Sequence, residues 1–195
     1  MTPDEERQIA ALMRQALQRS RGHASFFQWA PNRDVEEWGV VNHLRESLMA
    51  DRADFFRDIS IRGRGNDPPD CEARSNDGER IAIEVTELVD PAAIVAFKRG
   101  NPYRWTDWSR ESLREALQER LTTKDQRYSS LQGGPYGQYL LVVHTDEPML
   151  SHTVARTLLD TVRFARPAHI DRAFLLISYD PRLQRCPYIE FPFDA

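Results

Sequence analysis

Apolar residues recur at helical spacing in several stretches of the chain, and these stretches predict its helices. Residues 4–19 predict an amphipathic helix, and residues 34–49 predict a second one with Asp34 as a candidate N-cap. Residues 109–128 have the strongest helical pattern, with Ser109 at the start of an acidic first turn. The remaining helices are expected at about 149–164 and, as a helix or a loop, after Pro91.

Shorter apolar stretches between these helices predict strands. Residues 70–75 and 80–88 flank the turn signal SNDGE, so they predict a β-hairpin. Residues 138–145 and 172–180 are almost continuously apolar, which is typical of strands buried on both faces. Further strands are expected at 55–63, where polar and apolar residues alternate, and at 186–194, where prolines favour a sheet edge. Together these strands and helices predict an α/β fold with a mixed central sheet and helices on both faces.

Length and composition set the broad class of the protein. The chain has 195 residues, which we divide into an N-terminal helical extension, residues 1–32, and one domain, residues 33–195. Its residues are 41% hydrophobic and 29% charged, as in an ordinary folded protein. No apolar stretch approaches the roughly 18 residues of a membrane span. Because the acidic start is also unlike a signal peptide, we expect no membrane association and a cytoplasmic location. Cys71 and Cys186 lack zinc-site spacing and are expected to be packed thiols.

Two charged residues fall on the apolar faces of predicted helices. Glu37 is expected to point inward, or alternatively to face the helix dipole from the first turn. Lys124 could extend its ammonium group to solvent, or it could supply a cation to a buried site. The residues on the same faces are Val41, Leu44 and Leu48 for Glu37, and Leu113, Leu117, Leu121 and Tyr128 for Lys124.

The predicted hairpin carries the main candidate chemistry, a pair of carboxylates. Asp70 and Glu84 lie at similar distances from the turn, so they should be near cross-strand neighbours. An ion such as Mg²⁺ takes oxygen ligands, often one or two carboxylates. The small residues beside Glu84 leave space for an ion, although the same strand face could be an outward polar row. Glu72 could be a further ligand or a solvated strand acid.

These residues resemble the motif of the PD-(D/E)XK nuclease superfamily. The segments PPDCEA and IAIEVTEL, joined by a hairpin, are similar to its PD and (D/E)XK blocks. The resemblance covers about residues 33–145 and implies the restriction-endonuclease-like αβββαβ core of that superfamily. It also implies that Asp70 and Glu84 bind Mg²⁺ or Mn²⁺, with the Val85 carbonyl as a further ligand.

Two further roles come from the resemblance. Glu37 would match the acid often found on the first core helix of the superfamily. Thr86 occupies the position of the motif lysine, and a hydroxyl cannot supply that charge. In some members the lysine lies on the following helix, where Lys124 is the candidate. A lysine there could help to deprotonate the attacking water or stabilise the phosphate transition state.

The resulting hypothesis is a magnesium-dependent endonuclease that hydrolyses phosphodiester bonds, with DNA as the expected substrate. Arg62, Arg64, Thr86 and Tyr128 are candidate substrate contacts, together with the aromatic and basic residues at 103–108. The net charge of −4 argues mildly against a protein that coats nucleic acid, although it allows a local basic groove. The resemblance also allows a homodimer.

Two alternatives stay open. The chain could be a catalytically inactive binding or regulatory protein that keeps the nuclease fold, which Thr86 and the net charge of −4 favour. It could also bind a partner protein, such as a toxin that it inhibits, through exposed Trp105 and Trp108.

Overall fold

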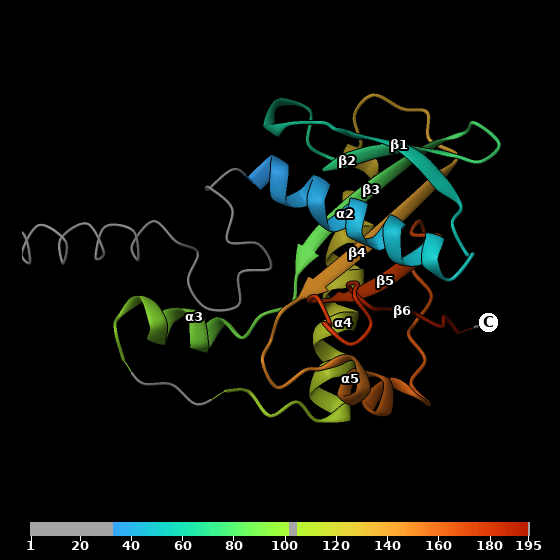
Figure 1. The fold of residues 1–195 in the computed structure, drawn as a ribbon. Coiled ribbons are helices and arrows are strands. Elements are labelled where there is room, and N and C mark those ends of the chain that lie inside the picture. Colours follow the sequence, from blue (N-terminus) through green and yellow to red (C-terminus); the bar gives the residue numbers. More distant parts are fainter. Residues whose placement is uncertain (1–32, 102–104, 195) are drawn as a thin grey trace, which may run out of the picture.

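The computed structural model describes residues 33–101 and 105–194. Within these residues the chain has an α/β fold, with a six-stranded mixed sheet and four α-helices (Figure 1). The predicted extension at 1–32, with its helix at 4–19, lies outside the described residues, as do residues 103 and 104 of the aromatic and basic segment. None of the described helices is both long and apolar enough to cross a bilayer.

The elements follow the expected order of a helix, three strands, a helix and a strand. The segment after Pro91, expected as a helix or a loop, forms a short helix before the second long helix. The elements are α2 (Arg33–Ala50), β1 (Phe56–Ile61), the 3₁₀ turn η1 (Arg64–Asn66), β2 (Cys71–Ser75), β3 (Arg80–Glu87), α3 (Pro91–Lys98), α4 (Arg110–Asp125), the 3₁₀ turn η2 (Gln126–Ser130), β4 (Gln138–Thr145), α5 (His152–Leu159), β5 (Arg172–Ile177) and β6 (Tyr188–Glu190).

The strands lie in the sheet in chain order, from β1 to β6. The first three are antiparallel, and β2 and β3 form the predicted hairpin. The connection through α4 makes β4 parallel to β3, and β5 is parallel to β4. As its prolines predict, the last strand lies at an edge, antiparallel to β5.

Helices cover both faces of the sheet, as predicted from its apolar central strands (Figure 1). α2 packs on one face through Val41, Leu44 and Leu48, and Cys71 lies in the same apolar cluster. α4 and α5 pack on the other face, against Leu141 and Val143 of β4. Because neighbouring strand residues point to opposite faces, Leu140 and Val142 of the same strand contact the α2 side. Cys71 and Cys186 are both buried free thiols, as expected.

Three predicted details are wrong. Asp34 lies inside the first turn of α2, since the described helix already begins at Arg33. α4 ends at Asp125, and the tighter 3₁₀ turn that follows rotates Tyr128 out of the apolar stripe, leaving it 41% exposed. The helix expected at about 149–164 is shorter, because α5 ends at Leu159.

The apolar stripe of α4 should contribute strongly to stability. Leu117 is 0% exposed and packs in the cluster between α4 and the sheet. Leu117→Ala should lower the free energy of unfolding by about 2–5 kcal/mol, because it removes apolar contacts and leaves a cavity. Leu183→Ala, at a leucine that is 43% exposed, should change it by about 0.5 kcal/mol or less. Urea unfolding followed by circular dichroism measures both, and equal losses in the two variants would contradict this packing.

Candidate metal centre

The hairpin brings Asp70 and Glu84 together across two strands. Cys71 of β2 pairs with Ile83 of β3, so the register carried one residue further sets Asp70 opposite Glu84. The Val85 N–H donates a hydrogen bond to Asp70 Oδ2 at 2.7 Å, which fixes the aspartate against β3. The two acids are therefore the close cross-strand neighbours that their offsets from the turn predict.

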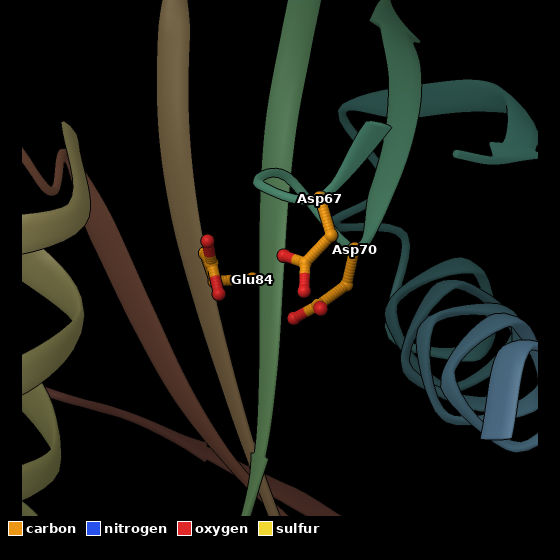
Figure 2. Close-up of side chains that lie close together, drawn as sticks. All are labelled: Asp67, Asp70 and Glu84. Atoms are coloured by element: carbon orange, nitrogen blue, oxygen red, sulfur yellow. The ribbon is translucent and has the colours of Figure 1, made fainter. Parts of the chain in front are cut away.

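A third acid, Asp67, joins this pair, and sequence reasoning did not find it. Asp67, Asp70 and Glu84 each offer a carboxylate oxygen, and these oxygens lie within 4.8 Å of one another. Figure 2 shows the three carboxylates converging beside β3. Asp67 was missed because the loop before β2 has no periodicity from which its side-chain direction could be predicted. The arrangement has the donor chemistry that Mg²⁺ or Mn²⁺ prefers.

Glu84 is the most deeply buried of the three acids, with 0% exposure. It lies on the face of β3 that α4 covers, the same face as Ala82. Its Oε1 atom has no hydrogen-bond partner within the described part of the chain. Because a buried carboxylate oxygen without a partner costs free energy, this atom favours the binding of a cation at the cluster.

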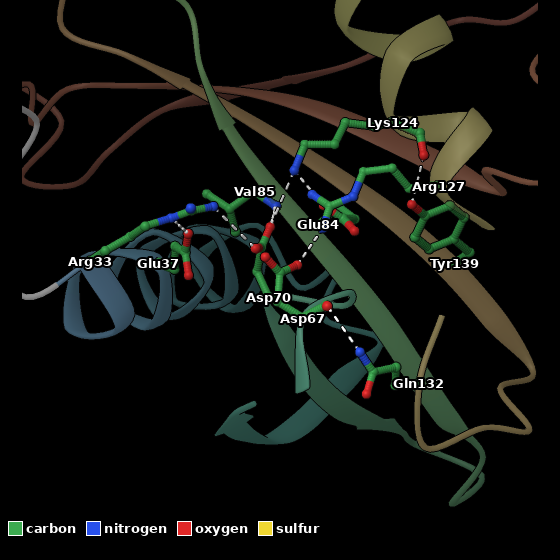
Figure 3. A network of polar contacts seen from close by, with 10 residues as sticks. All are labelled: Arg33, Glu37, Asp67, Asp70, Glu84, Val85, Lys124, Arg127, Gln132 and Tyr139. Atoms are coloured by element: carbon green, nitrogen blue, oxygen red, sulfur yellow. Dashed lines mark hydrogen bonds and ion pairs between the residues drawn. The ribbon is translucent and has the colours of Figure 1, made fainter. Parts of the chain in front are cut away.

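Two cations from the end of α4 and from η2 contact the acids (Figure 3). The Lys124 ammonium contacts Glu84 Oε2 and lies 3.4 Å from Asp70 Oδ2. Arg127 donates to Glu84 Oε2 at 2.9 Å and also to Asp67 Oδ1. Lys124 is buried, as its place in the apolar stripe predicts, and its ammonium group ends on Glu84 and Asp70 and not in bulk solvent. Arg127 was missed because it follows the end of α4, where helical spacing no longer predicts the direction of a side chain.

Glu37 and Arg33 approach the cluster from the opposite side of the sheet. Glu37 is buried on α2, as its place on the helix predicts, and pairs with Arg33 one turn earlier. The Arg33 guanidinium also lies 3.5 Å from Asp70 Oδ1. Glu37 is therefore linked to the acid cluster through Arg33, and it is not among the three acids whose oxygens converge.

Burial dominates the proton affinity of two of these acids. It raises the pKa of Glu84 to about 7, against the charges of Lys124 and Arg127, which lower it, while Asp70 raises it further. Burial also raises the pKa of Glu37 to about 7, with Asp70 adding to the rise and Arg33 opposing it. Burial therefore favours the protonated form of both carboxyl groups in the absence of an ion.

Other predicted residues lie outside this cluster. Glu72 pairs with Arg62 and Arg80 and accepts a hydrogen bond from the Tyr136 hydroxyl, so its carboxylate is already bound elsewhere. The predicted contact between Arg62 and substrate thus competes with an ion pair at 2.8 Å. Tyr128 stacks on His169, with 4.1 Å between ring centres. Arg64 lies in η1.

Two cavities reach Lys124, and both are also lined by Thr86 and Glu87 at the end of β3. One has a volume of about 530 Å³ and lies between the end of β3 and α4, with Trp108 and Arg120 in its wall. The other has a volume of about 230 Å³ and extends toward Arg33 and Glu37 on α2. Thr86, which occupies the position of the motif lysine, faces both cavities. The same cavities give access to the side chain of Lys124.

The two tryptophans proposed as protein-binding anchors differ. Trp105 is 42% exposed, whereas Trp108 is half-buried and packs against the apolar cluster under α4. The prediction that both are exposed is therefore wrong for Trp108.

Comparisons of this chain with models of protein families, with curated proteins and with solved structures find no match. The structure by itself therefore supports an α/β mixed sheet that carries a buried acidic cluster able to hold a metal ion.

Removing only one partner of the Lys124–Glu84 ion pair should destabilise the fold more than removing both charges. Lys124→Ala should lower the free energy of unfolding at pH 8 by about 3 kcal/mol, because it leaves a buried carboxylate with Arg127 alone as its cation. Glu84→Gln combined with Lys124→Met removes both charges and should recover most of that loss. Urea unfolding of the single and double variants measures the difference. A double variant no more stable than Lys124→Ala would contradict the assigned pairing.

The raised pKa of Glu84 predicts how stability without metal depends on pH. The pKa is about 7 in the folded chain against an ordinary value of 4.5, so the folded state binds more protons between these pH values. The free energy of unfolding in EDTA should therefore fall as pH rises through this window and level off above it. In Glu84→Gln the free energy of unfolding should fall less steeply with pH, and the difference in slope should reach up to about 1.4 kcal/mol per pH unit. Parallel pH profiles of the two proteins would contradict the raised pKa.

Proposed function

We propose that the chain is a metal-dependent nuclease of the PD-(D/E)XK type that hydrolyses phosphodiester bonds of DNA. The observation that carries the proposal is the convergence of Asp67, Asp70 and Glu84 on one buried site that Lys124 also enters. Three acids and a lysine at one end of a β-hairpin are the groups that metal-assisted phosphodiester hydrolysis uses.

The order of the elements supports the same class. α2, the strands β1 to β3, the helix α4 and the parallel strand β4 follow the αβββαβ order of the superfamily that the motif resembles. Asp70 lies immediately before the hairpin's first strand and Glu84 within its second, where the resemblance requires the metal ligands. The position of Lys124 supports the idea that a lysine from the next helix replaces the one that Thr86 displaces.

Each residue has a role in the proposed reaction. Asp67, Asp70 and Glu84 would hold Mg²⁺ or Mn²⁺, which when bound supplies a Lewis acid that polarises the phosphate and activates water. The Lys124 ammonium, held beside Glu84 and Asp70, would stabilise negative charge as it develops on the reacting phosphate. Glu37 would act at one remove, by holding Arg33 beside Asp70.

The cavities beside Lys124 give space for substrate. The two cavities, of about 530 and 230 Å³, share the end of β3 and Lys124 as walls, and the larger one extends along α4 while the smaller one extends toward α2. The preference for DNA rests on the resemblance, and the Val85 carbonyl keeps its proposed role as a ligand on the same basis.

A second candidate function is an inactive protein that keeps the nuclease fold for binding or regulation. One observation favours it: Lys124 and Arg127 already contact the same oxygen of Glu84, so the acid has cationic partners without a metal. In that case the cluster is an ion-pair network that only stabilises the fold.

Metal binding and cleavage together test the proposal. Isothermal titration with Mn²⁺ should give binding in the wild type and none in Asp70→Ala. With Mg²⁺ the wild type should cleave plasmid DNA, and Glu84→Gln should reduce the rate by about 10²-fold or more. Lys124→Ala should reduce kcat by a similar factor while metal binding persists. Single-stranded DNA and RNA in parallel assays define the substrate.

The matched control is Glu46→Gln, which changes an exposed acid on α2 that contacts the ring nitrogen Nδ1 of His43 at 3.1 Å. It should leave both Mn²⁺ binding and cleavage unchanged. A wild type that binds no Mn²⁺ contradicts the proposal, and binding without cleavage of any of the three substrates favours the inactive alternative.

A further inference from the structure

Arg127 and Lys124 each contact two of the three converging acids, but Arg127 joins Glu84 to Asp67, whereas Lys124 joins Glu84 to Asp70. The Arg127 guanidinium donates through one nitrogen to Glu84 Oε2 and through another to Asp67 Oδ1. These two acids come from different segments, the loop before β2 and the middle of β3. A single side chain therefore supplies the positive charge between groups that would also face a bound ion (Figure 3).

The charges show that this bridge conflicts with a bound ion. Without an ion, the three acids and Glu37 face the cations of Lys124, Arg127 and Arg33, so the fully ionised group carries a net charge of about −1. A divalent ion would reverse that sign while Arg127 stayed within a few ångströms. Like charges at about 4 Å repel by several kcal/mol in partly buried surroundings. Arg127 and the ion therefore compete for the carboxylates.

Burial shows which of the two cations can move. The Lys124 side chain is 10% exposed and its stem belongs to the buried face of α4. The Arg127 side chain is 30% exposed and starts from η2, beyond the end of α4. Its long side chain can leave the carboxylates without moving the helix, and a planar guanidinium is well suited to bind a phosphate through two nitrogens.

We propose that Arg127 is an exchange residue: it holds Asp67 and Glu84 when no ion is bound, and it turns to the phosphate of the substrate when a divalent ion takes its place. This inference rests on the proposed nuclease function and adds the residue that recognises the reacting phosphate. It also gives the acid cluster a stable state without metal, because the same arginine partly neutralises the charge that the ion would otherwise balance.

The test uses two readouts, of which one does not depend on activity. Arg127→Gln should bind Mn²⁺ more tightly than the wild type in isothermal titration, on the order of fivefold, because a competing cation is lost. The same variant should cleave DNA with kcat/KM reduced by about 10-fold to 100-fold, mainly through a higher KM. Arg127→Lys keeps the charge but loses the bidentate geometry of the guanidinium. Its Mn²⁺ affinity and its kcat/KM should both lie between those of the wild type and Arg127→Gln.

Controls separate the failure of this inference from the failure of the proposed function. Arg185→Gln changes an arginine of similar exposure that pairs with Asp51 away from the acid cluster, and it should alter neither readout. If the wild type and Arg127→Gln bind Mn²⁺ equally, or the variant binds it more weakly, the exchange is wrong although the metal site stands. If the wild type binds no Mn²⁺, both proposals are wrong. Should Arg127→Gln fail to fold, Arg127→Lys decides the same question.

Discussion

The site depends on the burial of one carboxylate, that of Glu84. Solvent does not reach it, and an unpaired charge in such a place costs several kcal/mol. The surrounding elements must therefore supply positive charge, and Lys124 and Arg127 do so from the end of α4 and from η2. Because Asp67, Asp70 and Glu37 add negative charge nearby, these two cations and Arg33 balance the acids only in part. This imbalance is the physical basis for expecting a divalent ion.

Rigid elements on both faces of the sheet hold these charges in place. Lys124 continues the buried leucine stripe of α4, so its position is set by packing against the sheet. The Val85 N–H fixes Asp70 from β3, and Arg33 reaches the same aspartate from α2. Charged groups held in this way need little rearrangement when charge develops nearby, which is the usual source of electrostatic catalysis. Arg127, on η2, is the exception.

Much of the arrangement was predictable where the chain is periodic. The hairpin offset placed Asp70 beside Glu84, and helical spacing placed Glu37 and Lys124 on inward faces. Prediction failed where periodicity ends. Tyr128 was assigned to the stripe of α4, but the helix becomes a 3₁₀ turn at Gln126 and changes the direction of each later side chain. Glu72 was considered as a further ligand or a solvated acid, but neighbouring arginines bind its carboxylate.

The sequence by itself determined the α/β class, the mixed sheet covered on both faces and the pairing of two acids, because hydrophobic periodicity and turn chemistry act locally. Only the tertiary structure decided that Asp67 completes the cluster and that Arg127 bridges it, because both depend on where a loop and a 3₁₀ turn meet in space. The raised pKa of Glu84 was likewise decided only by the tertiary structure. It arises from the exclusion of water by α4 and the sheet, which exists only once the chain has packed.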